Sequence, residues 1–150
     1  MSNIIIGIAI TILVIVPVVI LANYGKQKHK NALRRFRKIA AENSLNISDC
    51  DSCDLGIIGI DTDMKKLLYV QNGKDVVVVD TNEIKSCTIK TYPEVINGDF
   101  IDIIVMDIEL KDGRGSRVMQ LFSSENKLTM DEEKSIAEKW HRIIESHIAK

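Results

Sequence analysis

Two cysteines three positions apart form the residue pair with the clearest chemical potential in this sequence. Cys50 and Cys53 make a C-x-x-C pattern with Asp51 and Ser52 between them. Such a pair can chelate a metal ion or cycle between a dithiol and a disulfide. A redox pair normally opens a helix, whose N-terminus lowers the thiol pKa, whereas Asp51 would raise it. Cys50 and Cys53 are therefore candidate metal ligands, with two reduced loop thiols as the alternative.

A structural zinc site needs four protein ligands, so the pair would need two more. The sequence offers Cys87, His29, His141 and His147 for this role, without a second C-x-x-C or an H-x-x-x-H pattern. His141 and His147 are six positions apart, so they face different sides of a helix and cannot share one metal ion. We therefore expect no cofactor.

Enzyme signatures are missing from the sequence pattern. No Ser or Cys lies in a nucleophile-elbow context, and no glycine-rich loop precedes a helix to hold phosphate. Acidic residues occur in turns and strands, where they usually serve turn formation and not catalysis. These scattered acids are Asp61, Asp63, Asp80, Asp99, Asp102 and Asp107. The sequence therefore predicts a protein that is not an enzyme.

An uncharged apolar run extends from Ile4 to Ala22. About 20 apolar residues in a helix, rising roughly 1.5 Å each, span a hydrocarbon core of about 30 Å. A cleaved signal peptide would need a basic start and a shorter apolar run, but residues 1–3 carry no charged side chain. The sequence predicts an uncleaved transmembrane helix over residues 4–23, with residues 1–3 as an extracytoplasmic tip.

A basic segment follows the apolar run. Its seven cationic side chains are Lys26, Lys28, Lys30, Arg34, Arg35, Arg37 and Lys38. Positive charge beside a hydrophobic segment keeps that end in the cytoplasm. The expected location is a bacterial inner membrane crossed once, with the C-terminal domain in the cytoplasm. Each Lys or Arg near anionic headgroups contributes about 1 kcal/mol, so these side chains are predicted to contact the surface of the lipid bilayer.

The same segment is predicted to be a juxtamembrane amphipathic helix over residues 24–43, because its basic and apolar residues fall on opposite sides of a helix. The apolar ones are Ala32, Leu33, Phe36, Ile39 and Ala40. Two kinds of burial fit this stripe. It can lie in the membrane interface, or it can pack on the chain's own domain or on a neighbouring copy.

Charge divides the chain into two opposite parts. Residues 1–43 carry seven Lys and Arg side chains and one acid, Glu42, while the remainder carries 13 basic and 20 acidic side chains. Binding to nucleic acid requires a basic face on the folded module. An acidic domain therefore argues against nucleic acid as a partner.

Residues 44–150 read as a domain of about six antiparallel strands and one C-terminal helix. Residues 44–54 are polar and loop-like, and alternating or apolar runs follow at 55–60, 67–70, 76–79, 86–92, 100–110 and 117–122. Asn72-Gly73 and Asn97-Gly98 are turn signals, and the uneven alternation near Val105 to Asp107 predicts a bulge. A helix over 130–149 begins with the capping box Thr129-x-x-Glu132 and is expected to bury Trp140 in the core.

Four stretches of this domain resemble bacterial PH-like domains of the pleckstrin-homology superfold and small membrane-anchored proteins related to them. The resemblance covers roughly residues 42–148. It is carried by Ile58-Gly-Ile-Asp61 with Lys65-Lys-Leu-Leu-Tyr-Val70, by Val79-Asp-Thr-Asn-Glu-Ile-Lys-Ser-Cys-Thr-Ile89, by Leu110-Lys-Asp-Gly113 with Leu121-Phe122, and by Ala137-Glu-Lys-Trp-His-Arg-Ile-Ile144. It implies a six- or seven-stranded antiparallel barrel capped by the C-terminal helix, and an interaction role without a defined ligand.

Together these features predict a membrane-anchored α+β protein that presents its domain to a partner. The first hypothesis is a non-enzymatic interaction or scaffold module with an unidentified protein partner or a second copy of itself. The alternative is a sensor that binds a metal through Cys50 and Cys53 or a lipid at the barrel mouth. For the first hypothesis, the expected contact surface is the edge strand around Ser86 to Tyr92 with the loop from Pro93 to Asp99.

Overall fold

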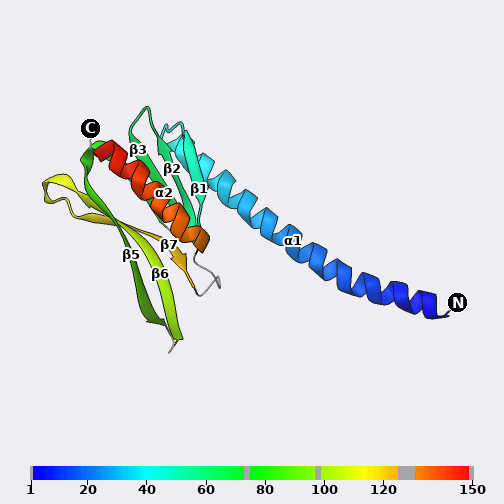
Figure 1. Ribbon diagram of the computed structural model, residues 1–150. Helices are drawn as coiled ribbons and strands as arrows, with labels where there is room; N and C mark the ends of the chain where they lie inside the picture. The colour runs from blue at the N-terminus through cyan, green and yellow to red at the C-terminus, as the bar shows by residue number, and fades with distance from the viewer. Residues whose placement is uncertain (1, 73–74, 97–98, 125–130, 149–150) are drawn as a thin grey trace. The chain divides into compact units, whose positions relative to one another are not determined.

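A single long helix, α1 (Ser2–Glu42), forms the N-terminal part of the protein in a computed structural model (Figure 1). The structure describes residues 2–72, 75–96, 99–124 and 131–148, and within them the side chains other than those of 2–14, 18, 20–23, 94–96 and 99–101. The chain divides into two units, Met1–Arg35 and Phe36–Lys150. The helices predicted over 4–23 and 24–43 are one continuous helix that passes through Pro17.

The predicted transmembrane helix over residues 4–23 is corrected by the structure. In the part of the chain that the structure describes, no helix is long and apolar enough to cross a membrane. A spanning helix needs about 20 consecutive apolar residues.

The second unit contains two antiparallel sheets (Figure 1). The first has the order β1 (Asp49–Ser52), β2 (Gly56–Asp61), β3 (Lys66–Gln71) and β4 (Val76–Asp80). The second has the order β5 (Ile84–Ile96), β6 (Asp99–Leu110) and β7 (Ser116–Ser123). Consecutive strands pair in each sheet, as in hairpin-connected chains.

The predicted six- or seven-stranded PH-like barrel is wrong, because the strands form two separate sheets of four and three strands. A 3₁₀ turn, η1 (Thr81–Glu83), ends β4, and the Asp80 carboxylate caps it by accepting a hydrogen bond from the Asn82 amide. Among the described residues no strand ladder joins β4 to β5, so the chain leaves one sheet before it enters the other. At the opposite edges the sheets meet through individual contacts, such as the 3.2 Å hydrogen bond from the Leu55 amide to the Leu121 carbonyl.

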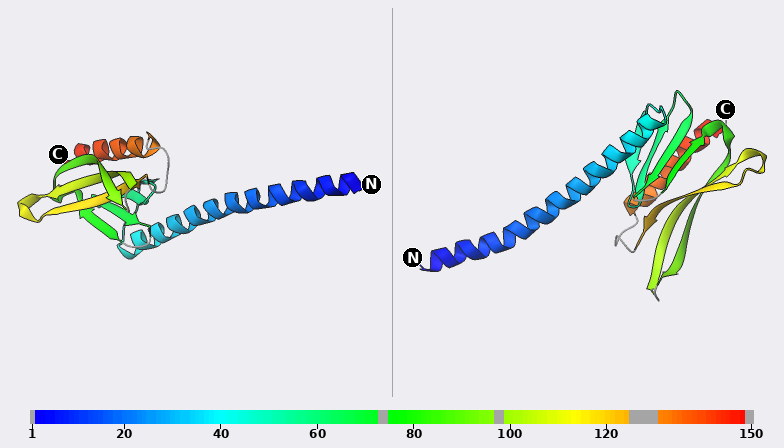
Figure 2. Two further views of the ribbon diagram at one scale, coloured as in Figure 1. Left: turned by 90° about the horizontal axis from the view of Figure 1, so that it is seen from below. Right: turned by 180° about the vertical axis from the view of Figure 1, so that it is seen from behind.

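One hydrophobic core joins both sheets to the C-terminal helix, α2 (Asp131–Ile148). Figure 2 shows α2 lying along one side of the two sheets. Trp140 and Ile144 of α2 are fully buried in this core, which confirms the prediction for Trp140. The first sheet contributes Ile58, Ile60, Leu67, Tyr69 and Val79, and the second contributes Ile104, Met106, Ile108, Met119 and Phe122. The predicted capping residue Thr129 lies outside the described residues.

The end of α1 packs on the first sheet within the second unit. Phe36 and Ala40 are buried. At these two positions the apolar stripe therefore packs on the chain's own domain and does not lie in the membrane interface. Gly59 of β2 lets the Phe36 ring approach, because a Cβ atom built at Gly59 would lie 2.7 Å from Phe36 Cζ. Ser44, with φ of 56°, turns the chain out of the helix in the left-handed conformation common at helix ends.

Two local expectations changed in detail. Residues 44–54 were expected to be a loop, but residues 49–52 form β1, which pairs with β2 from Asp49–Ile60 to Ser52–Ile57. The bulge expected near Val105 is found between Ile104 and Val105, where the pairing with β7 shifts. The glycines of both Asn-Gly signals lie outside the described residues.

Candidate functional site

The C-x-x-C pair is not poised for thiolate chemistry. Cys50 on β1 is exposed, whereas Cys53 is buried in the core beside Tyr69. Burial, with help from the Asp49 and Asp51 carboxylates, raises the pKa of the Cys50 thiol. Burial raises the pKa of Cys53 to about 12. Because thiolates are the metal ligands and nucleophiles, both shifts work against metal binding and redox exchange.

Two of the other candidate ligands, His141 and His147, contact backbone carbonyl groups. The His141 Nε2 atom lies 2.9 Å from the Cys87 carbonyl oxygen, so the imidazole donates to the backbone of β5 and not to the thiol. His147 Nδ1 lies 2.8 Å from the Ile143 carbonyl oxygen. Burial raises the pKa of Cys87 to about 12. The described residues contain no group of three or more His, Cys, Asp or Glu side chains that could hold a metal ion.

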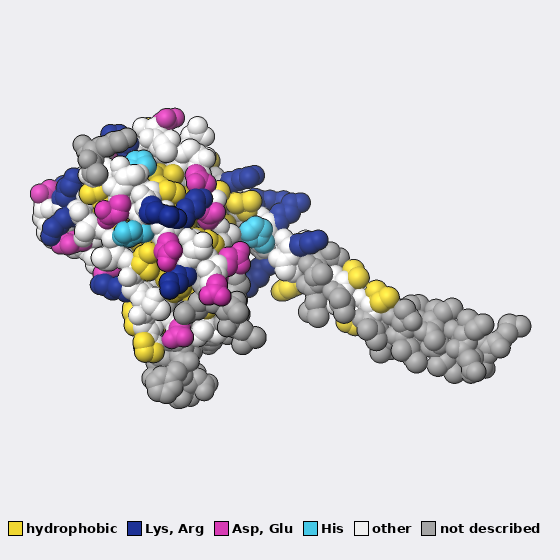
Figure 3. Space-filling model, in the orientation of Figure 1, with side chains coloured by type: hydrophobic (Ala, Val, Ile, Leu, Met, Phe, Trp, Pro, Cys, Tyr) yellow, Lys and Arg dark blue, Asp and Glu magenta, His cyan; other side chains and the backbone are white. Residues whose placement is uncertain are grey.

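The seven basic side chains predicted to contact lipid are exposed on α1. Figure 3 shows dark blue side chains gathered along the helix. Lys38 lies 3.8 Å from Glu42, and both side chains are exposed, so this ion pair contributes little. Residues 1–35 contain no Asp or Glu, so the first unit carries uncompensated positive charge.

A clamp between α2 and β1 was missed by the sequence analysis. Asp51 Oδ2 accepts hydrogen bonds from Trp140 Nε1 at 2.9 Å and from Lys139 Nζ at 2.6 Å. Lys139 Nζ also lies 3.1 Å from Asp49 Oδ2. The hydrogen bonds to Asp51 and Asp49 raise the pKa of Lys139. The usable signal was Trp140 itself, because a buried indole N–H needs an acceptor.

Two sheet edges are covered by other parts of the second unit. On β7, the Leu121 carbonyl accepts from the Leu55 amide, and the Gln120 carbonyl accepts from the Tyr69 hydroxyl. On β5, the Cys87 carbonyl accepts from His141 of α2. The edge strand expected to be the contact surface is therefore engaged by α2 at Cys87, close to Ser86.

The outer edge of β4 is different. The Asp75 carbonyl accepts from the Gln71 amide at 2.8 Å, and the Thr81 amide donates to the Lys65 carbonyl at 2.8 Å, so residues 75 and 81 face β3. Backbone groups of alternate residues in an antiparallel strand face the same way. Those of Val76 and Val78 therefore face away from β3. Their side chains are 43% and 38% exposed.

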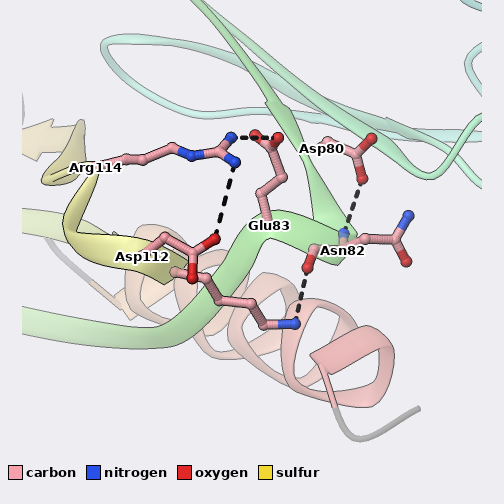
Figure 4. A network of polar contacts seen from close by, with 6 residues as sticks. Asp80, Asn82, Glu83, Asp112 and Arg114 are labelled. Atoms are coloured by element: carbon pink, nitrogen blue, oxygen red, sulfur yellow. Dashed lines mark hydrogen bonds and ion pairs between the residues drawn. The ribbon is translucent and has the colours of Figure 1, made fainter.

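A polar network fixes the end of β4 against the turn between β6 and β7 (Figure 4). Beyond the Asp80 cap, Lys111 Nζ donates to the Asn82 carbonyl at 2.8 Å. Arg114 pairs with Glu83 at 2.6 Å and with Asp112 at 3.8 Å. The network joins the residues that follow β4 to the turn between β6 and β7. It lies on exposed residues, so it adds little stability.

Comparison with protein-family models, with curated proteins and with solved structures gives no match for this chain. The resemblance to PH-like domains stays a prediction.

Proposed function

We propose that this chain is a non-enzymatic interaction module that binds a partner protein by strand addition at the outer edge of β4. The observation that carries the proposal is the outward direction of the Val76 and Val78 backbone groups, together with the exposure of both side chains. In strand addition, main-chain hydrogen bonds give affinity and alternate side chains give specificity. Here the alternate side chains are two valines.

The chemistry of the edge supports this reading over a ligand sensor. Sheet proteins normally protect an edge with charge, proline or a covering element. β4 consists of four valines and one terminal Asp80, and the end of α1 leaves Val76 and Val78 exposed. The metal version of the sensor lacks support, since neither Cys50 nor Cys53 favours its thiolate.

We also propose that the basic segment of α1 binds an anionic lipid surface and so places the module beside a membrane. Support comes from the exposure of its seven cationic side chains and from the absence of acids in residues 1–35. This part of the proposal concerns surface binding and is independent of the β4 edge.

A displayed library of random ten-residue peptides tests the strand-addition proposal. Peptides selected on the full chain are expected to be rich in β-branched residues and to lose binding to Val78→Pro. The Val78 amide faces outward, so proline there removes no hydrogen bond to β3. Val118→Lys is the matched control, because Val118 is an exposed valine on β7. Selected peptides that bind Val78→Pro as well as the wild type would overturn the proposal.

A further inference from the structure

The four edge strands differ in how they are protected against pairing. β1 is short and carries Asp49 and Asp51, which α2 engages through Lys139. β5 has Lys85 and Lys90 in ion pairs with β6 and a carbonyl bonded to His141. The exposed part of β7 includes Arg117, and its far end is bonded to Leu55. β4 instead carries four consecutive valines before Asp80, and the backbone groups of Val76 and Val78 face outward.

Resting on the proposed function, we propose that the occupant of the β4 edge is β4 of a second copy of this chain, paired antiparallel about a two-fold axis through Val77. In this register Val76 of one copy lies opposite Val78 of the other, and the reverse. Both residues have outward backbone groups, so each pair exchanges two backbone hydrogen bonds. The two four-stranded sheets would then form one continuous sheet.

The side chains of β4 suit this register. Every position from 76 to 78 faces a valine of the other copy, and a β-branched pair contributes roughly 0.2–1 kcal/mol. Asp75 falls opposite Val79 of the second copy, and Asp80 lies beyond the last valine pair. No acid therefore faces an acid, which would be unfavourable. A second copy of β4 therefore places valines opposite the exposed valines of this edge.

An isologous contact of this kind closes on itself, since each copy uses the same strand once. The valines exposed at Val76 and Val78 would become covered on both copies. A hetero-partner strand would have to bring its own apolar residues to these positions, whereas a second copy has them already.

Sedimentation velocity and hydrogen exchange of the purified full chain test the pairing. The wild type is expected to dimerise as concentration rises, with the Val76 and Val78 amides becoming protected from exchange in the dimer. Val78→Pro blocks the outward hydrogen bond, and Val78→Lys places two charges within the interface. Each variant is expected to raise the dimer dissociation constant at least tenfold, while Val118→Lys leaves it unchanged.

Trp140 fluorescence reports whether each variant is folded. Val78→Lys keeps the backbone N–H of residue 78, so it tests the interface even if proline disturbs the strand. A monomeric wild type, or a dimer in which the Val76 and Val78 amides exchange freely, would overturn the pairing. Assembly through α1 gives that second result. If the wild type is monomeric yet selected peptides need an intact Val78, strand addition stands without self-pairing. If the peptides also ignore Val78→Pro, the proposed function falls with it.

Discussion

Trp140 and Asp51 lie 89 positions apart in the chain and meet through a 2.9 Å hydrogen bond from the indole N–H to a carboxylate oxygen. The bond joins α2 to β1, the outermost strand of the first sheet. Lys139 donates to the same oxygen and lies 5.6 Å from the centre of the Trp140 ring. The sole Trp of the chain is thus both a core residue and the hydrogen-bond donor to the Asp51 carboxylate on an edge strand.

Asp51→Ala is expected to lower the free energy of unfolding by about 1–3 kcal/mol, because it leaves the buried indole N–H without its acceptor. Urea unfolding followed by Trp140 fluorescence measures the loss. Asp49→Ala is the matched control, since Asp49 makes only an exposed ion pair worth roughly 0–1 kcal/mol. Equal losses for the two variants would show that the hydrogen bond to Trp140 is not what matters.

Asp61 should make stability depend on pH. Its carboxylate accepts hydrogen bonds from the Met64, Asn46 and Asp63 amides, which hold its pKa below the ordinary value of 3.8. A lowered folded pKa gives stabilisation that is complete above the unfolded pKa and is lost as pH falls through the folded one. The stability advantage of wild type over Asp61→Asn should therefore be constant near neutral pH and shrink below about pH 4.

Chemical unfolding of both proteins across that pH range measures the difference. Asp63→Asn provides the control, because the Asp63 side chain is exposed and caps nothing in the described structure. An advantage that grows as pH falls would contradict the assignment.

Gly59→Ala is expected to destabilise the second unit by about 1–3 kcal/mol through overpacking. Its Cβ would lie 2.7 Å from Phe36 Cζ, 3.0 Å from Ile47 Cγ2 and 3.1 Å from Cys50 Cβ. Phe36→Leu shortens the side chain nearest to that Cβ, so the double variant should recover part of the loss. Urea midpoints of the four proteins in the cycle measure the coupling.

Gly56→Ala is the comparison for this cycle. There the new Cβ would lie 2.5 Å from the Val70 carbonyl oxygen, which is backbone and cannot move aside. Phe36→Leu should give no rescue at Gly56, and rescue at both sites would mean that the Phe36 contact is not specific.

The three thiols should react in two classes. Cys50 is exposed and is expected to react first with a thiol reagent, though more slowly than a free thiol because its pKa is raised. Cys53 and Cys87 are buried and should react only on unfolding. Cys50→Ser should remove the first class, and added zinc should leave the unfolding midpoint unchanged. A midpoint that zinc raises in the wild type but not in Cys50→Ser would restore the metal sensor.

Replacing Lys26, Lys28 and Lys30 by Gln is expected to weaken binding to anionic vesicles by about 1 kcal/mol per charge, roughly fivefold each. The measurement compares co-sedimentation of the full chain with phosphatidylcholine vesicles that contain or lack phosphatidylserine. Replacement of the same lysines by Arg keeps the charge and should preserve the preference. An undiminished preference for phosphatidylserine in the Gln variant at low salt would rule out these three lysines as lipid contacts.

The sequence by itself determined the elements that depend on local pattern. The valine run predicted β4, the helix predicted over 130–149 corresponds to α2, and the charge pattern separated the basic helix from the acidic domain. These signals are local, because helix and strand periods can be read within a few turns or pairs.

Only the tertiary structure decided which strands are edges and which backbone groups are satisfied. β1 was missed because the polar run Asp49–Ser52 has no apolar alternation, and it is a strand through pairing with β2 and the contact of Asp51 with Trp140. The separation of the sheets depends on η1, a 3₁₀ turn capped by Asp80. The Cys87 carbonyl is contacted by His141, which is 54 positions away in the chain, whereas the Val78 side chain stays exposed in the described structure. Such long-range contacts leave no local pattern in the sequence.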